Sequence, residues 1–269
     1  MAKVKEISLG IQGVIPVAAY ENLRPNYNIT IELDETDDMD AVIHKHRAYL
    51  KSLFELDANR AKADLIEKQY AVVKFYEKDG KKYPSVTSVL SWDRDWRITE
   101  DELRQYASRG TVIHKIIEIY LREKKWVDPE ECPELAEEVS IVLGGSLGLS
   151  WKDCSYRAFF EKFADDIEVE KLEGEVINDE LMYGGRYDIL GKFKGKRSIM
   201  DWKTGTSSDF RQLAAYAACE KDIEQLVILP VGPTDNKQGY MNPKVCTTVH
   251  AEFKAFAKAR AKFRLRFGI

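Results

Sequence analysis

Gly184–Gly205 reads GGRYDILGKFKGKRSIMDWKTG, and this stretch decides the fold of the chain around it. Two runs rich in apolar residues flank the dipeptide Lys194-Gly195, which suits a two-residue hairpin turn because glycine accepts a positive φ. With this turn, the two strands pair so that Asp188 lies directly opposite Asp201. A three-residue loop would shift the pairing by one residue.

The predicted hairpin sets two acids against each other. Directly opposed residues have Cβ atoms roughly 5 Å apart, where like charges repel. Alternation along the second strand puts Lys203 on the face of Asp201, while Met200 and Trp202 point to the other face. A divalent cation removes the repulsion, because Mg²⁺ and Mn²⁺ prefer carboxylate oxygens, and a nearby lysine stabilises charge that develops on a phosphate. The alternative is a surface hairpin with two solvated acids and an ordinary lysine.

The composition indicates a globular protein. The chain has 269 residues, of which 44% are hydrophobic and 32% are charged, so it suits one medium domain with an appendage or two small domains. No apolar run approaches the roughly 20 residues that span a bilayer, and the start lacks the apolar core of a secretory signal. We therefore expect a cytosolic protein without membrane contact. The net charge of −4 means that a nucleic acid would need a local basic patch.

Residues 1–70 predict a small strand-and-helix module in which we identify no chemical motif. Two alternating segments, ISLGIQGVIPV and NITIEL, predict short strands. An acidic run precedes a helix expected from about Asp40 to Phe54, and a second helix is expected from Ala58 to about Gln69. The sequence leaves the role of this module open, and the module is a candidate surface for a protein partner.

Residues 71–269 predict a mixed α/β domain with a central sheet flanked by helices. Asp79-Gly80 marks a hairpin, and Thr99 with Glu102 forms a capping box that opens a long helix to about Glu123. The other expected elements are helices near 133–143 and 151–164, strands near 168–177, 186–193 and 197–202, a helix at 210–221, strands at LVILPV and 245–249, and a final helix. Three strands, a helix and a further strand in this order favour a mixed sheet.

Five motifs stand in a fixed order along this second domain. They are YPSVT at 83–87, GTVIH at 110–114, a glutamate at 173, the pair GGRYD at 184–188 and DWKT at 201–204, and QLAAY at 212–216. Together they resemble the PD-(D/E)XK nuclease superfamily, and more narrowly its RecB-type exonuclease branch, which includes the mitochondrial genome maintenance exonuclease and phage exonucleases. The resemblance covers about residues 70–269 and implies a restriction-endonuclease-like core.

The resemblance implies roles for the residues of the hairpin. Asp188 and Asp201 would bind the metal, and the backbone carbonyl of Trp202 would add a ligand. Lys203 would be the catalytic lysine. His114 would be a further metal ligand through neutral imidazole, although a lone helical histidine is more often a hydrogen-bonded core residue.

Three other candidates keep a structural alternative. Glu173 would orient a helix or a water at the metal, but nearby glutamates compete for this role, namely Glu168, Glu170 and Glu175. Gln212 and Tyr216 lie four residues apart and so share a helix face. The resemblance directs both toward the DNA backbone or the catalytic lysine. Otherwise Gln212 would be a capping-box partner of Asp209, and Tyr216 a core residue.

Two further segments bear on DNA binding. The C-terminal run EFKAFAKARAKFRLRFGI suits a packed closing helix, with Arg260 on the apolar stripe and a basic opposite face that could contact phosphates. Aromatic and basic residues also alternate at Trp92, Arg94, Trp96 and Arg97, where they would stack on single strands or pack in the core.

These observations predict a divalent-metal-dependent deoxyribonuclease that uses Mg²⁺ or Mn²⁺. The resemblance favours an exonuclease acting on DNA ends or single strands in replication, recombination or repair, in a bacterial or phage-infected cell. Some relatives hold an iron–sulfur cluster, but the four cysteines here are scattered, so we expect none. The alternatives are a structure-selective endonuclease and a non-cleaving nucleic-acid-binding or assembly protein on the same fold.

Overall fold

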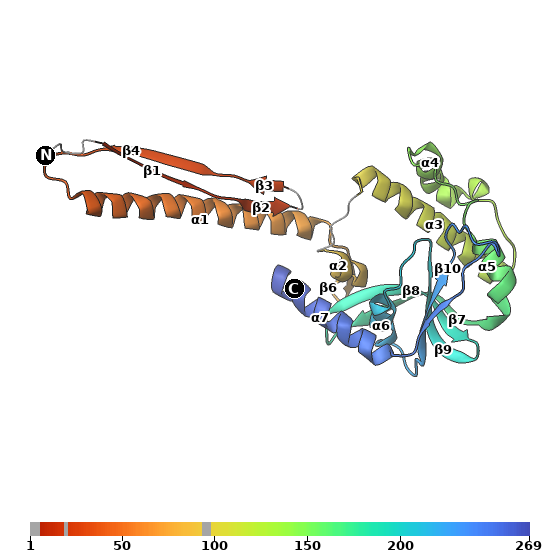
Figure 1. The fold of residues 1–269 in the computed structure, drawn as a ribbon. Helices are drawn as coiled ribbons and strands as arrows, with labels where there is room; N and C mark the ends of the chain where they lie inside the picture. The colour runs from red at the N-terminus through yellow and green to blue at the C-terminus, as the bar shows by residue number, and fades with distance from the viewer. Residues whose placement is uncertain (1–5, 19–20, 93–97) are drawn as a thin grey trace. The chain divides into compact units, whose positions relative to one another are not determined.

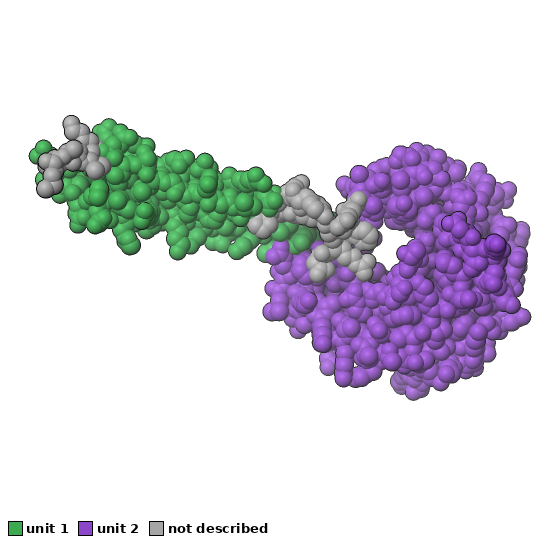
Figure 2. Space-filling model, in the orientation of Figure 1, with its two compact units in different colours: residues 1–73 green, residues 74–269 purple. Residues whose placement is uncertain are grey.

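The structure is a computed structural model that describes residues 6–18, 21–92 and 98–269. The chain divides into two compact units, residues 1–73 and residues 74–269 (Figure 2). Within the described ranges, no helix is both long enough and apolar enough to cross a membrane. Each unit has its own secondary structure and is described by itself.

The N-terminal unit is a long β-hairpin that packs against one helix (Figure 1). Its elements are β1 (Glu6–Gln12), β2 (Ile15–Ala18), β3 (Glu21–Leu23), β4 (Asn26–Glu32) and α1 (Met39–Ala71). β1 pairs with β4 and β2 pairs with β3, in both cases antiparallel. Gly13 has no side chain at the point where the ring of Phe54 lies, so the helix approaches the hairpin closely there.

The prediction of two helices in this unit was wrong, because α1 is one helix of 33 residues. Asp38 caps its start by accepting hydrogen bonds from the backbone N–H groups of Asp40 and Ala41. No glycine or proline follows Phe54 before the second predicted start, so nothing breaks the helix there. The buried residues Leu50 and Ala61 lie three turns apart on one stripe, which continues across the predicted break.

The C-terminal unit contains a five-stranded mixed sheet in the order β11-β10-β9-β8-β7. Its strands are β7 (Ile167–Asn178), β8 (Tyr183–Phe193), β9 (Lys196–Lys203), β10 (Gln225–Pro230) and β11 (Lys244–Cys246). β9 and β10 are parallel, and every other neighbouring pair is antiparallel. A mixed central sheet flanked by helices is the fold class that the sequence predicted.

The hairpin of β8 and β9 has the predicted two-residue turn. Lys194 and Gly195 both have positive φ, as a type I′ turn requires, and Phe193 pairs with Lys196. The regular pairs continue to Ile189 and Met200, one position before the two acids. The predicted register is therefore confirmed for these five pairs, and the direct opposition of Asp188 and Asp201 stays a prediction.

Helices cover both faces of the sheet (Figure 1). They are α2 (Val86–Ser91), α3 (Glu100–Glu123), α4 (Ala136–Gly144), α5 (Tyr156–Phe163), α6 (Arg211–Ala217) and α7 (Val249–Phe267), and the hairpin of β5 (Phe75–Lys78) and β6 (Lys81–Pro84) precedes them. Short 3₁₀ turns lie at Pro129–Glu131, Pro133–Leu135 and Ala164–Asp166. α3, α4 and α5 share one core cluster with Met200 and Trp202 of β9, while α6 and α7 pack together.

The long helix α3 starts where the sequence predicts it. Thr99 and Glu102 exchange the two hydrogen bonds of a capping box. Val112, Ile113 and Ile116 are fully buried on the face that packs against the core cluster. Burial of this stripe fixes how α3 lies against the sheet, and so fixes which of its polar side chains reach the end of β8.

Candidate metal centre

Three side chains from three elements bring their ligand atoms together. His114 of α3, Glu173 of β7 and Asp188 of β8 each offer one atom, and these atoms lie within 4.8 Å of one another. His114 Nδ1 is 3.4 Å from Asp188 Oδ1. Carboxylate oxygens suit Mg²⁺ and Mn²⁺, and imidazole suits transition metals. The donor set therefore fits a divalent cation.

Asp188 is a buried carboxylate with strong compensation. Its Oδ2 accepts a hydrogen bond of 2.9 Å from the backbone N–H of Trp202. Burial alone would raise its pKa, but His114, Lys203 and this hydrogen bond together hold the pKa below its usual value. Asp188 is therefore ionised at neutral pH.

Asp201 is buried with less compensation. Burial, and then the negative charge of Asp188, raise its pKa to about 6. Lys203 Nζ lies 2.5 Å from Asp201 Oδ2, while Trp202 between them turns its ring into the core cluster. The predicted alternation of this strand is confirmed, and the influence of one acid on the other agrees with their predicted juxtaposition.

A chain of hydrogen bonds connects Lys203 to α6. Lys203 Nζ donates to Gln212 Oε1 over 3.1 Å, and Gln212 Nε2 donates to the hydroxyl of Tyr216 over 3.0 Å. Burial alone would lower the pKa of Lys203, but Asp201 outweighs it, so the pKa is raised and the amine is charged. The capping-box alternative for Gln212 is wrong, because the N-cap of α6 is Phe210 rather than Asp209.

The backbone of β7 directs Glu173 toward this cluster. Glu173 has a φ of +51°, an uncommon conformation for a residue with a side chain, between the regular pairs Leu172–Ile189 and Gly174–Tyr187. Gly174 is required beside it, because a Cβ at this position would lie 2.2 Å from the ring of Tyr187. Burial, and then Asp188, raise the pKa of Glu173.

The competing glutamates of β7 have other surroundings. Glu168 forms an ion pair with Lys192, and Glu170 with Arg197. Glu175 lies at an exposed position. Of these four acids, Glu173 is the one that belongs to the donor cluster found among the described residues.

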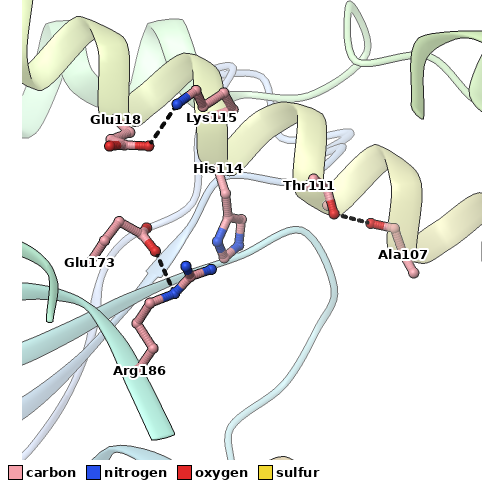
Figure 3. Close-up of a pocket in the computed structure, with 8 residues that line it drawn as sticks. Ala107, Thr111, His114, Lys115, Glu118, Glu173 and Arg186 are labelled. Atoms are coloured by element: carbon pink, nitrogen blue, oxygen red, sulfur yellow. Dashed lines mark hydrogen bonds and ion pairs between the residues drawn. The ribbon is translucent and has the colours of Figure 1, made fainter. Parts of the chain in front are cut away.

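A cavity of about 590 Å³ opens beside the cluster (Figure 3). Its lining residues are Ala107, Gly110, Thr111, His114, Lys115, Glu118, Glu173 and Arg186. Arg186 pairs with Glu173 at 2.8 Å, a contact that is not among the predictions from the sequence. The available signal was strand alternation, since Arg186 precedes Asp188 by two residues and so shares its side of β8.

Two other predicted positions have simpler outcomes. The ring of Trp202 packs edge-on against His114, with 5.9 Å between ring centroids, and the ligand role of its carbonyl stays a prediction. Arg260 of α7 is buried and donates hydrogen bonds to the carbonyl oxygens of Met182 and Ile269, as expected for the packed stripe. Arg94, Trp96 and Arg97 lie outside the described residues.

The mixed sheet flanked by helices and the donor cluster agree with a metal-dependent nuclease fold. The family model of the PD-(D/E)XK nuclease superfamily matches residues 88–264, and the chain belongs to this superfamily. Its members use divalent metals, in agreement with the donor set described above. No curated protein matches the sequence.

The two glycines before Arg186 make room for aromatic rings, which leads to a prediction about stability. A Cβ on Gly185 would lie 2.2 Å from the ring of Tyr216. We expect Gly185→Ala to lower the free energy of unfolding by about 1–3 kcal/mol, because the buried ring must move. Urea unfolding measures this change. Gly144→Ala is the control, since nothing lies within 4 Å of its added Cβ, and an equal loss there would contradict the steric explanation.

Metal binding should depend on pH through two groups. The pKa of Asp201 is higher in the folded protein than its ordinary value of 3.8. Protonation of Asp201 therefore contributes stability that is complete below pH 3.8 and is lost as the pH rises through about 6. For His114, burial lowers the pKa but Asp188 outweighs it, so the contribution of the charged form is complete below 6.5 and is lost as the pH rises through the raised pKa. Metal ions bind the deprotonated forms of both groups.

We therefore expect the rise in melting temperature caused by Mn²⁺ to grow between about pH 5 and about pH 8, because metal binding must release these protons. Thermal unfolding with Mn²⁺ and with EDTA across this range measures the effect. Asp201→Asn should remove part of the pH dependence. If the rise in melting temperature caused by Mn²⁺ stays constant with pH in the wild type, the result contradicts metal binding through Asp201 and His114.

Proposed function

We propose that the protein is a divalent-metal-dependent DNA exonuclease that acts on DNA ends or single strands. The observation that carries the proposal is the convergence of the His114, Glu173 and Asp188 donors with the ion pair of buried Asp201 and half-buried Lys203 in a nuclease-superfamily fold. A structural ion-pair network alone would not need three ligand atoms around an open cavity.

The residues of the site have two kinds of role, namely binding the metal and stabilising charge on the phosphate. His114, Glu173, Asp188 and Asp201 would hold Mg²⁺ or Mn²⁺. The metal, when bound, supplies Lewis-acid activation of the scissile phosphate and lowers the pKa of water. Lys203 keeps its positive charge beside this position and stabilises the negative charge that develops on the phosphate oxygens.

The relay from Lys203 to α6 has a positioning role. Gln212 accepts from the ammonium and is itself fixed by Tyr216, which is 2% exposed. A hydrogen-bonded partner that is itself held in place restricts the rotamers of the lysine, so the charge is placed before the substrate arrives. We assign Gln212 and Tyr216 to this support rather than to direct chemistry.

The assay that tests the function compares linear and circular DNA. End-labelled single-stranded and double-stranded DNA and closed circles are incubated with Mg²⁺, Mn²⁺ or EDTA. An exonuclease degrades linear DNA from its ends in either metal and spares the circles. Cleavage of circles would replace the exonuclease proposal by an endonuclease, and the position of the lost label reports polarity.

Asp201→Ala is the matched control in the same assay. If the wild type leaves every substrate intact with both metals, the alternative of a non-cleaving nucleic-acid-binding or assembly protein replaces the nuclease proposal. The exonuclease part rests on the resemblance of the ordered motifs to the RecB-type branch, so the circular substrate decides it separately.

For residues 1–73 we propose that they bind a protein partner and take no part in DNA cleavage. Every ligand atom of the donor cluster belongs to residues 74–269. Tyr49, Leu56 and Tyr70 of α1 are large apolar side chains that remain exposed. Replacing Leu56 by lysine should leave cleavage of short oligonucleotides unchanged, and loss of cleavage in the folded variant would contradict the separation of roles.

A further inference from the structure

We propose, on the basis of the proposed nuclease function, that Arg186 is a DNA-binding residue that alternates between Glu173 and a substrate phosphate. In the free protein its guanidinium neutralises the carboxylate of Glu173. When DNA enters the cavity, the guanidinium moves to a phosphate oxygen and leaves the carboxylate to the metal. Binding of DNA and binding of metal thereby strengthen each other.

Arg186 forms a diagonal contact across β7 and β8. Its direct neighbour on β7 is Glu175, yet its Nε lies 2.8 Å from Oε2 of Glu173, two residues nearer to the donor cluster. Among the described residues, this ion pair is the one polar contact of the Arg186 side chain. The guanidinium therefore keeps most of its five N–H donors for another partner.

Exposure separates the two members of the pair. The side chain of Arg186 is 56% exposed, whereas that of Glu173 is 18% exposed. Both line the cavity that also contains His114, and Figure 3 shows the three side chains close to one another. Arg186 can therefore turn toward solvent while Glu173 stays in place.

The charges explain why the pair should open in the presence of DNA. In the free protein the guanidinium of Arg186 lies 2.8 Å from the carboxylate of Glu173 and balances its negative charge. The same positive charge repels a metal ion that approaches Glu173. A phosphate offers the guanidinium fork a bidentate acceptor, which a carboxylate already bound through Nε provides less well.

The other cation of the cavity is less available. Lys115 forms ion pairs with both Glu118 and Glu134, at 3.5 Å and 3.2 Å. Its charge is therefore shared between two carboxylates, whereas Arg186 has one described partner. This comparison selects Arg186 as the phosphate-binding group of the cavity.

Arg186→Gln tests the proposal through binding rather than cleavage. Two dissociation constants for Mn²⁺ are measured by titration calorimetry, without DNA and with a phosphorothioate single strand that is checked to remain intact. DNA affinity is measured separately in EDTA. In the wild type we expect DNA to tighten Mn²⁺ binding by about tenfold, within the usual range of coupling between sites.

In Arg186→Gln we expect three changes from wild type. Mn²⁺ binds more tightly without DNA, because the competing charge is gone. DNA binds more weakly in EDTA, because a phosphate contact is lost. The ratio of the Mn²⁺ dissociation constants without and with DNA falls close to one, because the residue that links the two sites is removed. Arg186→Lys keeps the charge without the fork and should give intermediate values.

A purely structural role for Arg186 predicts the opposite pattern. If the arginine only anchors Glu173, Arg186→Gln weakens Mn²⁺ binding without DNA and leaves the coupling at its wild-type value, and this result overturns the proposal. Arg104→Gln is the matched control, since Arg104 forms an exposed ion pair with Glu137 outside the cavity. If the wild type does not cleave DNA but DNA still tightens its Mn²⁺ binding, the nuclease function alone is rejected. If the wild type cleaves DNA and Arg186→Gln keeps the wild-type coupling between DNA and Mn²⁺ binding, this inference alone is rejected.

Discussion

Asparagine in place of Asp188 is expected to abolish metal-dependent DNA cleavage, with a fall in the single-turnover rate of about 10³-fold or more, because a bound metal contributes several kcal/mol to charge stabilisation. Asp188 is 6% exposed and interacts with His114 and with the backbone of Trp202. Asparagine keeps the shape and one acceptor for the Trp202 N–H. The variant therefore removes the charge with little change of packing.

Two measurements separate this effect from misfolding. Thermal unfolding should show that Asp188→Asn is folded, while calorimetry should show that it has lost high-affinity Mn²⁺ binding. Asp165→Asn is the control, because Asp165 is an exposed acid outside the donor cluster. A folded Asp188→Asn variant that still cleaves DNA at the wild-type rate would remove Asp188 from the mechanism.

Methionine in place of Lys203 is expected to lower the single-turnover rate by about 10²–10³-fold, the usual cost of removing one charge-stabilising donor. The amine contacts Asp201 and Gln212, and its raised pKa shows that it is charged. Methionine has a similar length and no charge. Metal binding should survive, because no donor of the cluster is removed.

The pattern of effects distinguishes Lys203 from its support. DNA affinity measured with Ca²⁺ should change little in Lys203→Met, so the loss should appear in the chemical step. Gln212→Ala should cause a smaller fall in rate, because it removes the acceptor but leaves the charge. If Gln212→Ala reduced the rate more than Lys203→Met, the assigned order of roles would be wrong.

Helix predictions succeeded where local signals were complete and failed where they were ambiguous. The capping box of α3 is a local pair of hydrogen bonds, and the helix starts where that pair predicts. The predicted break in α1 had no glycine or proline to cause it, and the buried residues Leu50 and Ala61 lie on the same side of the helix before and after it. Without a helix-breaking residue, a helix that packs against neighbouring strands continues.

Glu173 shows why the candidate site was only partly predictable. Four glutamates of β7 stand close together in the sequence, and alternation separates Glu168 and Glu170 from Glu173 and Glu175 but does not choose within either pair. The choice depends on a positive φ at Glu173 and on a glycine that admits the ring of Tyr187. Both are consequences of packing between β7 and β8, which a pattern along one strand does not contain.

By itself, the sequence determined the hairpin and the juxtaposition of its acids with Lys203, because turn chemistry and two-residue alternation are local properties of the backbone. Only the tertiary structure decided which residues complete the cluster. His114 reaches Asp188 because the apolar stripe of α3 is buried against the core. Arg186 of β8 reaches Glu173 on the neighbouring strand β7. The raised pKa of Asp201 is likewise tertiary, since it comes from burial and from the charge of Asp188.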